Sequence, residues 1–367
     1  MDKIYKQLTI WAVCKDSGGT AGILPVVDAL MMASHTVRLF ADGKAIDLLP
    51  RLGRDFFACT SVDDVLSRYP NERPNLFLTS MCSGGGVGRD LVPHLRGVCP
   101  IVALQDTYGA RLLTDWSEFR FRPDFICVND EVGAHIVHEA WPDMPANRIK
   151  ITGYPALDRY SGYNAADVAI KTRQTLQLES GKAIVVYFGQ VARTGEVLQE
   201  VVVALNELRQ DLYFIPRQHG RMVTDAPEQM SYWQAALADF KGGTLIKDTS
   251  AVETASLLAS ADVVLAMYST VLTEAAVLRK QSIAVLYPDV GMQQFLTETG
   301  GVMTEFPLVR LGCTVKVSLR QELTDALIAA LGRGLGLEAN QSRYFLADGK
   351  NAQRVVESLI YAANNRF

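Results

Sequence analysis

The order of apolar segments limits this chain to one fold class. Short apolar runs rich in β-branched and aromatic residues alternate with helix-like stretches, and the whole series occurs twice. The clearest runs are Leu8–Val13, Leu76–Thr79 and Ile101–Leu104 in the first half, and Ala183–Phe188 and Val263–Ala266 in the second. Strands that alternate with helices pair into parallel sheets covered on both faces. The sequence therefore predicts an α/β protein that contains two parallel sheets.

A polar stretch from Pro155 to Lys182 interrupts the series and predicts the domain boundary. We expect a Rossmann-like N-terminal domain over residues 1–160 and a second Rossmann-like domain over residues 161–350. Residues 351–367 are expected to form a terminal helix that packs back on the N-terminal domain. Each domain has a length that suits a single hydrophobic core.

Charge and composition exclude several classes of function. The 367 residues include 36 Lys and Arg against 40 Asp and Glu, a net charge of −4. This balance argues against nucleic-acid binding and against electrostatic adsorption to anionic lipid. No apolar stretch is long enough to cross a membrane, and six scattered cysteines form no Cys-x-x-Cys pair. We expect a cytoplasmic protein with reduced thiols, no metal site, no nucleic-acid partner and no membrane span.

Glycine-rich loops follow several predicted strands. Gly18, Gly19 and Gly22 come after the first strand, Cys82–Gly88 follows a later one, and Gly189 follows the first strand of the second half. Ligands of open α/β sheets bind at this edge, and a helix N-terminus there offers N–H groups to an anion. The first loop would contact a phosphate or the reacting end of a substrate. A tight turn from strand to helix needs glycine in any case.

Positive charge gathers at two strand ends of the second half. Arg193 lies in the loop that contains Gly189, and Arg217, His219 and Arg221 follow the next strand. Arginine and histidine at such positions suit a diphosphate group. His219 would be a phosphate ligand or a general acid, or would only hydrogen-bond its own loop.

A third motif in the second half combines hydroxyl groups with a carboxylate. Ser269 and Thr270 stand at the expected start of a helix, where hydroxyl and N–H groups can hold phosphate. Glu274 follows one turn later and can accept hydrogen bonds from both hydroxyls of a ribose, although a carboxylate there can also cap the helix. Gln293 and Gln294 form an amide pair that suits sugar hydroxyls.

These motifs together resemble nucleotide-sugar enzymes of the GT-B fold, and nearly the whole chain takes part in the resemblance. The most similar groups are the peptidoglycan N-acetylglucosaminyltransferases that convert lipid I to lipid II and the lipid A disaccharide synthases. Gly18–Gly22 resembles their N-terminal glycine loop, and Ile151–Pro155 resembles their Val-Thr-Gly-Asn-Pro segment. Ala261–Glu274 resembles their nucleotide-binding segment, and Gln293 and Gln294 stand at the spacing of their sugar-binding pair.

The resemblance implies two Rossmann-like domains whose parallel sheets face each other across a cleft. The first domain would hold the acceptor and the catalytic groups, and the second would hold the nucleotide sugar. We expect inverting transfer from a nucleotide-diphosphate sugar, with a UDP-sugar as donor and positive side chains in place of a metal. No cofactor is expected, the acceptor is not identified, and a homodimer is compatible with the sequence. Asp106 is expected to be the base, and Asp16 would be the base or cap its own loop.

Three alternatives stay open at this point. Leu104–Arg111 resembles the His-Val-Glu-Ala-Gly-Leu-Arg segment of UDP-N-acetylglucosamine 2-epimerases, which share the fold. An epimerase or hydrolase of that kind would need Asp106 and Glu118 as catalytic carboxylates, with His219 at a strand end. A non-catalytic nucleotide-sugar-binding protein is favoured by Ile23, which stands where the transferases carry a histidine. The donor could also carry an alditol phosphate instead of a sugar.

Overall fold

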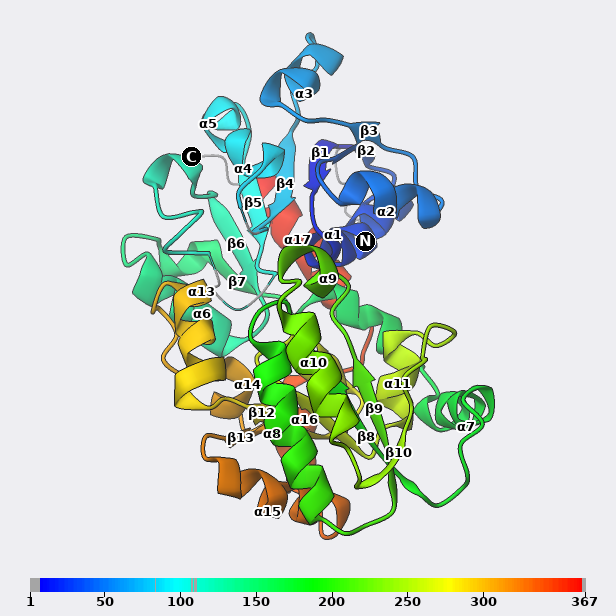
Figure 1. Ribbon diagram of the computed structural model, residues 1–367. Helices are drawn as coiled ribbons and strands as arrows, with labels where there is room; N and C mark the ends of the chain where they lie inside the picture. Colours follow the sequence, from blue (N-terminus) through cyan, green and yellow to red (C-terminus); the bar gives the residue numbers. More distant parts are fainter. Residues whose placement is uncertain (1–6, 83, 107, 109–110, 365–367) are drawn as a thin grey trace. The chain divides into compact units, whose positions relative to one another are not determined.

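A computed structural model describes residues 7–82, 84–106, 108 and 111–364. The chain divides into two compact units, whose elements are labelled in Figure 1. The first contains the chain up to Ser161, together with Glu298–Met303 and the C-terminal stretch from Asp348. The second contains Gly162–Thr297 and Thr304–Ala347. No helix in the described part of the chain is both long and apolar enough to span a membrane.

The first unit is built on a seven-stranded sheet in which every neighbouring pair is parallel. Its strand order is β3-β2-β1-β4-β5-β6-β7. The strands are β1 (Thr9–Cys14), β2 (Thr36–Ala41), β3 (Phe57–Ala58), β4 (Leu76–Ser80), β5 (Ile101–Leu104), β6 (Phe125–Val128) and β7 (Ile149–Ile151). The helices are α1 (Ser17–Met32), α2 (Ala45–Arg51), α3 (Val62–Arg68), α4 (Val87–Asp90), α5 (Val92–Leu95), α6 (Glu131–Ala140) and α17 (Asn351–Asn364).

Two helices from opposite ends of the sequence cover one face of this sheet. Side chains of α1 and α17 pack together against strands β1, β4, β5 and β6, and α17 is the red helix beside α1 in Figure 1. Leu30 of α1 and Val355 and Leu359 of α17 are among the fully or nearly fully buried residues of this cluster. The C-terminal helix therefore completes the core of the first unit.

The second unit repeats the same topology with six parallel strands in the order β10-β9-β8-β11-β12-β13. The strands are β8 (Ala183–Phe188), β9 (Leu212–Arg217), β10 (Gly243–Leu245), β11 (Val263–Ala266), β12 (Gln281–Val285) and β13 (Val315–Val317). The helices are α7 (Ala165–Thr175), α8 (Thr194–Glu207), α9 (Met222–Asp225), α10 (Gln229–Ala238), α11 (Thr254–Ser260), α12 (Val271–Val277), α14 (Pro307–Arg310), α15 (Arg320–Leu331) and α16 (Glu338–Tyr344), while α13 (Gln293–Thr299) begins in this unit and ends in the first.

In both units the order of strands reverses beside the first strand, between β1 and β4 and between β8 and β11. This is the arrangement of a Rossmann-like sheet, and ligands of such sheets bind at the carboxyl ends of the strands near that point. The predicted fold class, two parallel Rossmann-like sheets, is confirmed. The core of the second sheet lies under α8, α10 and α15, with Trp233 of α10 almost fully buried.

The structure differs from the sequence prediction at several element ends. Helix α1 begins at Ser17, within the glycine loop. Asp16 explains the early start because its side chain caps the helix. The short strands β7 and β13 were not predicted; each has three residues, and all three in β7 and two in β13 are at least partly exposed. Such edge strands lack the continuous apolar run that marks a central strand.

The position of α17 predicts that truncating Leu359 destabilises the first unit. Leu359 is 1% exposed, so Leu359→Ala should lower the free energy of unfolding by about 2–4 kcal/mol. Urea denaturation followed by circular dichroism measures this change. Leu52→Ala, in the same unit but 51% exposed, is the matched control and should cost no more than about 0.5 kcal/mol. Equal effects of the two variants would contradict the buried position of the helix.

Candidate functional site

The first candidate region is the turn from β1 into α1, beside the point where the strand order reverses. Asp16 is the N-cap of α1, and its Oδ1 accepts a hydrogen bond from the backbone N–H of Gly19 at 2.8 Å. This is the capping role that the sequence analysis gave as one of two alternatives for Asp16. The cap allows the helix to begin three residues after the strand ends.

The glycines of this turn are needed because other side chains occupy the space beside them. A Cβ atom on Gly18 would lie 2.5 Å from Asp106 Oδ1, and one on Gly19 would lie 2.1 Å from Ser80 Oγ. At Gly22 the same atom would come within 3.1 Å of the Tyr154 ring. Real Cβ atoms do not approach that closely at the first two positions. The glycines thus let polar groups from three other segments reach the first turn of the helix.

Asp106 follows β5 and has the strongest electrostatic perturbation among the predicted catalytic residues. Burial and the negative charge of Asp16 raise the pKa of Asp106 to about 7. The single proton of the Tyr154 hydroxyl is shared between the Gly18 carbonyl at 2.9 Å and Asp106 Oδ1 at 3.5 Å, and the longer branch to the carboxylate lowers the pKa of Asp106. A carboxyl group that titrates near neutral pH is suited to accept a proton from a reacting group.

The two carboxylates also bear on what the α1 N-terminus can bind. Asp16 already occupies the Gly19 amide, and Asp106 adds a second negative group beside Gly18. A helix N-terminus carries roughly half a positive charge, which two carboxylates outweigh. The N-terminus of α1 is therefore surrounded by negative groups of the protein itself, and the role of this turn toward a ligand stays a prediction.

The second glycine loop, after β4, is bound to carboxylates of the protein itself. Gly84, Gly85 and Gly86 all have positive φ angles. The Gly84 amide donates to Asp115 Oδ2 at 2.6 Å, and the amide that follows Gly86 donates to Asp42 Oδ2 at 2.9 Å. Two backbone amides of this loop, which the glycine pattern suggested as ligand contacts, therefore donate to side chains of the protein itself.

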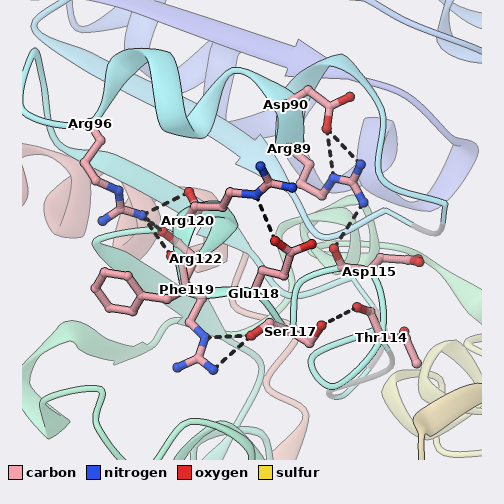
Figure 2. A network of polar contacts seen from close by, with 10 residues as sticks. All are labelled: Arg89, Asp90, Arg96, Thr114, Asp115, Ser117, Glu118, Phe119, Arg120 and Arg122. Atoms are coloured by element: carbon pink, nitrogen blue, oxygen red, sulfur yellow. Dashed lines mark hydrogen bonds and ion pairs between the residues drawn. The ribbon is translucent and has the colours of Figure 1, made fainter.

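Glu118 lies in a separate polar network of the first unit, shown in Figure 2. Its carboxylate pairs with Arg120 at 2.9 Å, and its side chain is 60% exposed. Arg96 donates to backbone carbonyls of the same loop, and Arg89 donates to the Asp115 carbonyl. Among the described residues, no hydrogen bond or ion pair joins Glu118 to Asp106.

In the second unit, Gly189 is explained by packing. A Cβ atom there would lie 2.7 Å from the ring of Trp233 on α10. Thr194, the first residue of α8, accepts a hydrogen bond from the amide of Gln190 at 3.0 Å. The loop after β8 is thus a tight turn held by its neighbours, and a role of Gly189 toward a ligand stays a prediction.

Arg193 connects two segments that the sequence analysis had treated separately. It has a left-handed conformation with φ of 56°, and its guanidinium pairs with Glu196 at 2.7 Å. The same group donates to the Asp289 carbonyl at 2.7 Å and to Gln293 Oε1 at 3.0 Å. Two predicted ligand-binding side chains, Arg193 and Gln293, therefore meet at the carboxyl-terminal edge of the second sheet.

The positive residues at the end of β9 and in the loop that follows it contact different partners. Arg217 Nη1 donates to the carbonyl and hydroxyl oxygens of Thr249, both at 2.6 Å. His219 Nδ1 accepts from the Arg221 amide at 3.1 Å, and Arg221 pairs with Asp225 at 3.5 Å. His219 hydrogen-bonds its own loop, which is one of the roles that the sequence left open; its role toward a ligand stays a prediction.

The hydroxyl motif lies at the start of α12, as expected. Ser269 Oγ accepts a hydrogen bond from the Val271 amide at 3.3 Å, while Thr270 is the N-cap residue and makes no capping hydrogen bond through its side chain. Thr270 is exposed, and Glu274 and Gln294 are partly buried. Their roles in binding a nucleotide or sugar stay predictions.

The structure thus gathers Asp16, Gly18, Gly19, Gly22 and Asp106 in one place. It also joins Arg193 to Gln293, and it leaves Glu118 outside both groups. Tyr154 was missed, because its segment, Ile151–Pro155, was considered only for its resemblance to a family segment. No cluster of three His, Cys, Asp or Glu residues that could hold a metal occurs within the described residues.

Comparison with known proteins identifies the fold. No protein-family model matches the chain, and no curated protein does. A similar solved structure is a UDP-GlcNAc 2-epimerase from Neisseria meningitidis bound to UDP-GlcNAc, with a TM-score of 0.70 and 12% identity over 96% of this chain and 100% of that one. A glycosyltransferase from Rickettsia africae has a TM-score of 0.66 and 11% identity over 99% of this chain and 100% of that one. MurG from Acinetobacter baumannii has a TM-score of 0.62 and 13% identity over 96% of this chain and 99% of that one. The chain has the GT-B fold of these proteins.

The raised pKa of Asp106 predicts a stability that depends on pH. Because the folded-state pKa of about 7 exceeds the ordinary value of 3.8, the folded protein binds more protons than the unfolded chain between these values. Stability therefore falls as the pH rises from 4 to 7. Asp106→Asn removes this loss, so the variant should exceed the wild type by up to about 4 kcal/mol at pH 8 and by much less at pH 4.

Urea denaturation of both proteins at several pH values measures this difference. Asp28→Asn is the matched control, because Asp28 lies on α1 and pairs with Arg54 in a partly exposed position. The free energy of unfolding of Asp28→Asn at pH 8 should not exceed that of the wild type. A stability difference for Asp106→Asn that does not change with pH would show that this carboxyl group has no raised pKa.

Proposed function

We propose that this GT-B chain is a metal-independent, inverting glycosyltransferase that takes its sugar from a nucleotide-diphosphate donor, with a UDP-sugar as the expected donor. The observation that carries the proposal is the Asp106 carboxylate, held against the first turn of α1 with a pKa of about 7. This group lies at the edge of the first sheet where α/β proteins bind their ligands.

In the proposed reaction, Asp106 removes the proton from an acceptor hydroxyl. The hydroxyl oxygen attacks the anomeric carbon of the sugar from the side opposite the leaving group. The bond from that carbon to the diphosphate oxygen breaks, and the nucleoside diphosphate leaves with the bonding electrons. A single displacement of this kind inverts the anomeric centre. A base whose pKa is near the working pH is deprotonated in a large fraction of molecules and still binds a proton strongly enough to remove it from the acceptor.

The second unit supplies the proposed donor site. Ser269 and Thr270 would hold the diphosphate, and Glu274 would accept the ribose hydroxyls. Arg193, Arg217 and neighbouring positive residues would stabilise the charge that develops on the leaving group, the role a metal ion has in other enzymes. Gln293 and Gln294 would hydrogen-bond the sugar. The bound UDP-GlcNAc of the similar Neisseria structure supports a nucleotide sugar as the ligand class.

A UDP-sugar 2-epimerase is the second candidate, and one observation favours it. The epimerase from Neisseria meningitidis has a TM-score of 0.70 with this chain. The position of Glu118 weighs against it, because this carboxylate is 60% exposed and paired with Arg120. Epimerisation at the second carbon would need a second carboxylate beside Asp106. We therefore rank transfer above epimerisation.

The proposed roles predict a large loss of activity for one carboxylate variant and almost no change for another. Asp106→Asn should lower the rate of sugar transfer by about 10²–10⁴-fold, and Glu118→Gln should change it by less than about threefold. The wild type is first incubated with UDP-, GDP-, CDP- and dTDP-sugars in the presence of EDTA, with mass spectrometry and sugar NMR as readouts. The bound donor should stay intact until an acceptor alcohol is added.

Rapid epimerisation or hydrolysis of a donor without acceptor would contradict the transferase proposal, and loss of that activity in Glu118→Gln would establish the epimerase instead. Loss of activity in EDTA, restored by a divalent metal, would exclude the metal-independent mechanism. Failure of every nucleotide sugar to bind would reject the donor class itself.

Arg193 is predicted to contribute to nucleotide binding. Arg193→Ala removes the positive charge and its contact with Gln293, so the dissociation constant for UDP should rise about tenfold, the effect expected of one charged hydrogen bond. Isothermal titration calorimetry with UDP measures it. Arg320→Ala is the matched control, because Arg320 pairs with the Asp289 side chain in the same segment and is 51% exposed. Its affinity for UDP should match the wild type, and equal losses in both variants would refute a specific role for Arg193.

A further inference from the structure

One tyrosine reaches the proposed base from a strand at the far edge of the sheet. Tyr154 follows β7, which lies two strands from β5 and four strands from β1 in the strand order. The side chain reaches Gly18 and Asp106 because the chain turns back after β7. The short 3-10 helix Pro155–Tyr160 then packs against α1. The contact is therefore produced by the path of this segment and not by the sheet itself.

The C-terminal helix holds this turn in place. Gly153 has a φ of +78°, and a Cβ atom on it would lie 2.0 Å from Asn351 Oδ1. Asn351 Nδ2 donates to the Tyr154 carbonyl at 3.2 Å. The carboxylate of Asp158 accepts from the amides of Asn351 and Ala352 at 3.0 and 2.8 Å. The backbone on both sides of the tyrosine is thus fixed by the start of α17.

The tyrosine hydroxyl in turn bridges two groups of the candidate site. It donates to the Gly18 carbonyl at 2.9 Å and lies 3.5 Å from Asp106 Oδ1. Its ring lies beside Gly22 of α1, where an added Cβ atom would come within 3.1 Å of the ring. Since Oδ1 faces the tyrosine, Oδ2 is the carboxylate oxygen left to receive a proton.

We propose that Tyr154 is the positioning residue for Asp106, tying the carboxylate to the α1 turn so that Oδ2 is presented to the acceptor hydroxyl. The inference rests on the proposed function for the role of Asp106 as base. The side chain itself would not touch the reacting atoms. It would act through the orientation and the protonation of the carboxylate.

The titratable and charged groups that act on Asp106 come from three elements. Asp16 at the start of α1 raises the pKa of Asp106, and Tyr154 lowers it. The Cys82 thiol, after β4, is the third group, and its own pKa is raised well above the ordinary value by burial and by both carboxylates. Because this thiol is neutral, it does not shift the pKa of Asp106. When the tyrosine hydroxyl is removed, burial and Asp16 still raise that pKa and the Tyr154 hydrogen bond no longer lowers it.

The test is a titration of the Asp106 carboxyl carbon by NMR in protein labelled with ¹³C-aspartate, with the resonance assigned through Asp106→Asn. In Tyr154→Phe the pKa of Asp106 should rise by about half a unit to one unit, as loss of one hydrogen bond implies. The acidic limb of the transfer rate against pH should move by the same amount. The kcat should fall about tenfold, while the KM for the donor should stay within about twofold.

Tyr160→Phe is the matched control, because this tyrosine ends the 3-10 helix that follows Tyr154 and its hydroxyl accepts from Arg159 at 3.0 Å. It should leave the Asp106 titration unchanged. If Tyr154→Phe fails to fold, 3-fluorotyrosine at position 154 keeps the ring and hydroxyl. Because it is a stronger donor, it should lower the pKa of Asp106.

An unchanged titration in Tyr154→Phe, or in the fluorinated protein, would overturn the inference. An equal shift in Tyr160→Phe would do so as well, since it would trace the effect to packing. The titration needs no donor and no acceptor. Absence of sugar transfer by the wild type would therefore reject the proposed function, and the titration would still decide whether Tyr154 sets the state of Asp106.

Discussion

The candidate site of the first unit depends on three glycines in the first two turns of α1. Gly18, Gly19 and Gly22 each leave a space that a group from another segment fills: Asp106 after β5, Ser80 at the end of β4, and Tyr154 after β7. A methyl group at either of the first two would overlap a polar atom of its neighbour. Close packing at the helix turn thus brings together groups that are far apart in the sequence.

The same packing sets the electrostatics of the site. The Asp106 carboxylate is confined between the helix turn and the sheet edge, where Asp16 is its charged neighbour. Confinement disfavours the ionised form, and a nearby like charge disfavours it further. A carboxyl group on an open loop would titrate near its ordinary value and would be a weak base at neutral pH. The geometry that requires glycine is therefore also the geometry that raises the pKa.

The sequence predicted the parallel sheets, because central strands such as β8 and β11 are apolar on both faces, and it placed glycine loops at the correct strand ends. Asp106 was recognised because it directly follows a strand. Tyr154 could not be recognised, since its contact with Gly18 spans 136 residues and depends on the turn after an edge strand that has no apolar run. The meeting of Arg193 with Gln293 was missed for the same reason, because it joins loops 100 residues apart. Periodicity reports local structure, while such contacts depend on tertiary paths.

The two units use one topology, but the charged residues predicted for the site are acidic in the first unit and basic at the ends of β8 and β9 in the second. In the first, carboxylates of Asp16 and Asp106 lie at the ends of β1 and β5; in the second, Arg193 and Arg217 lie at the ends of β8 and β9. A base must be negative when it takes a proton, and a departing diphosphate needs positive charge beside it. These needs conflict within a single pocket, because an arginine close to Asp106 would lower the pKa of the base. In the proposed reaction, therefore, the base and the groups that stabilise the diphosphate come from different units, and each sheet carries the charge that its own role requires.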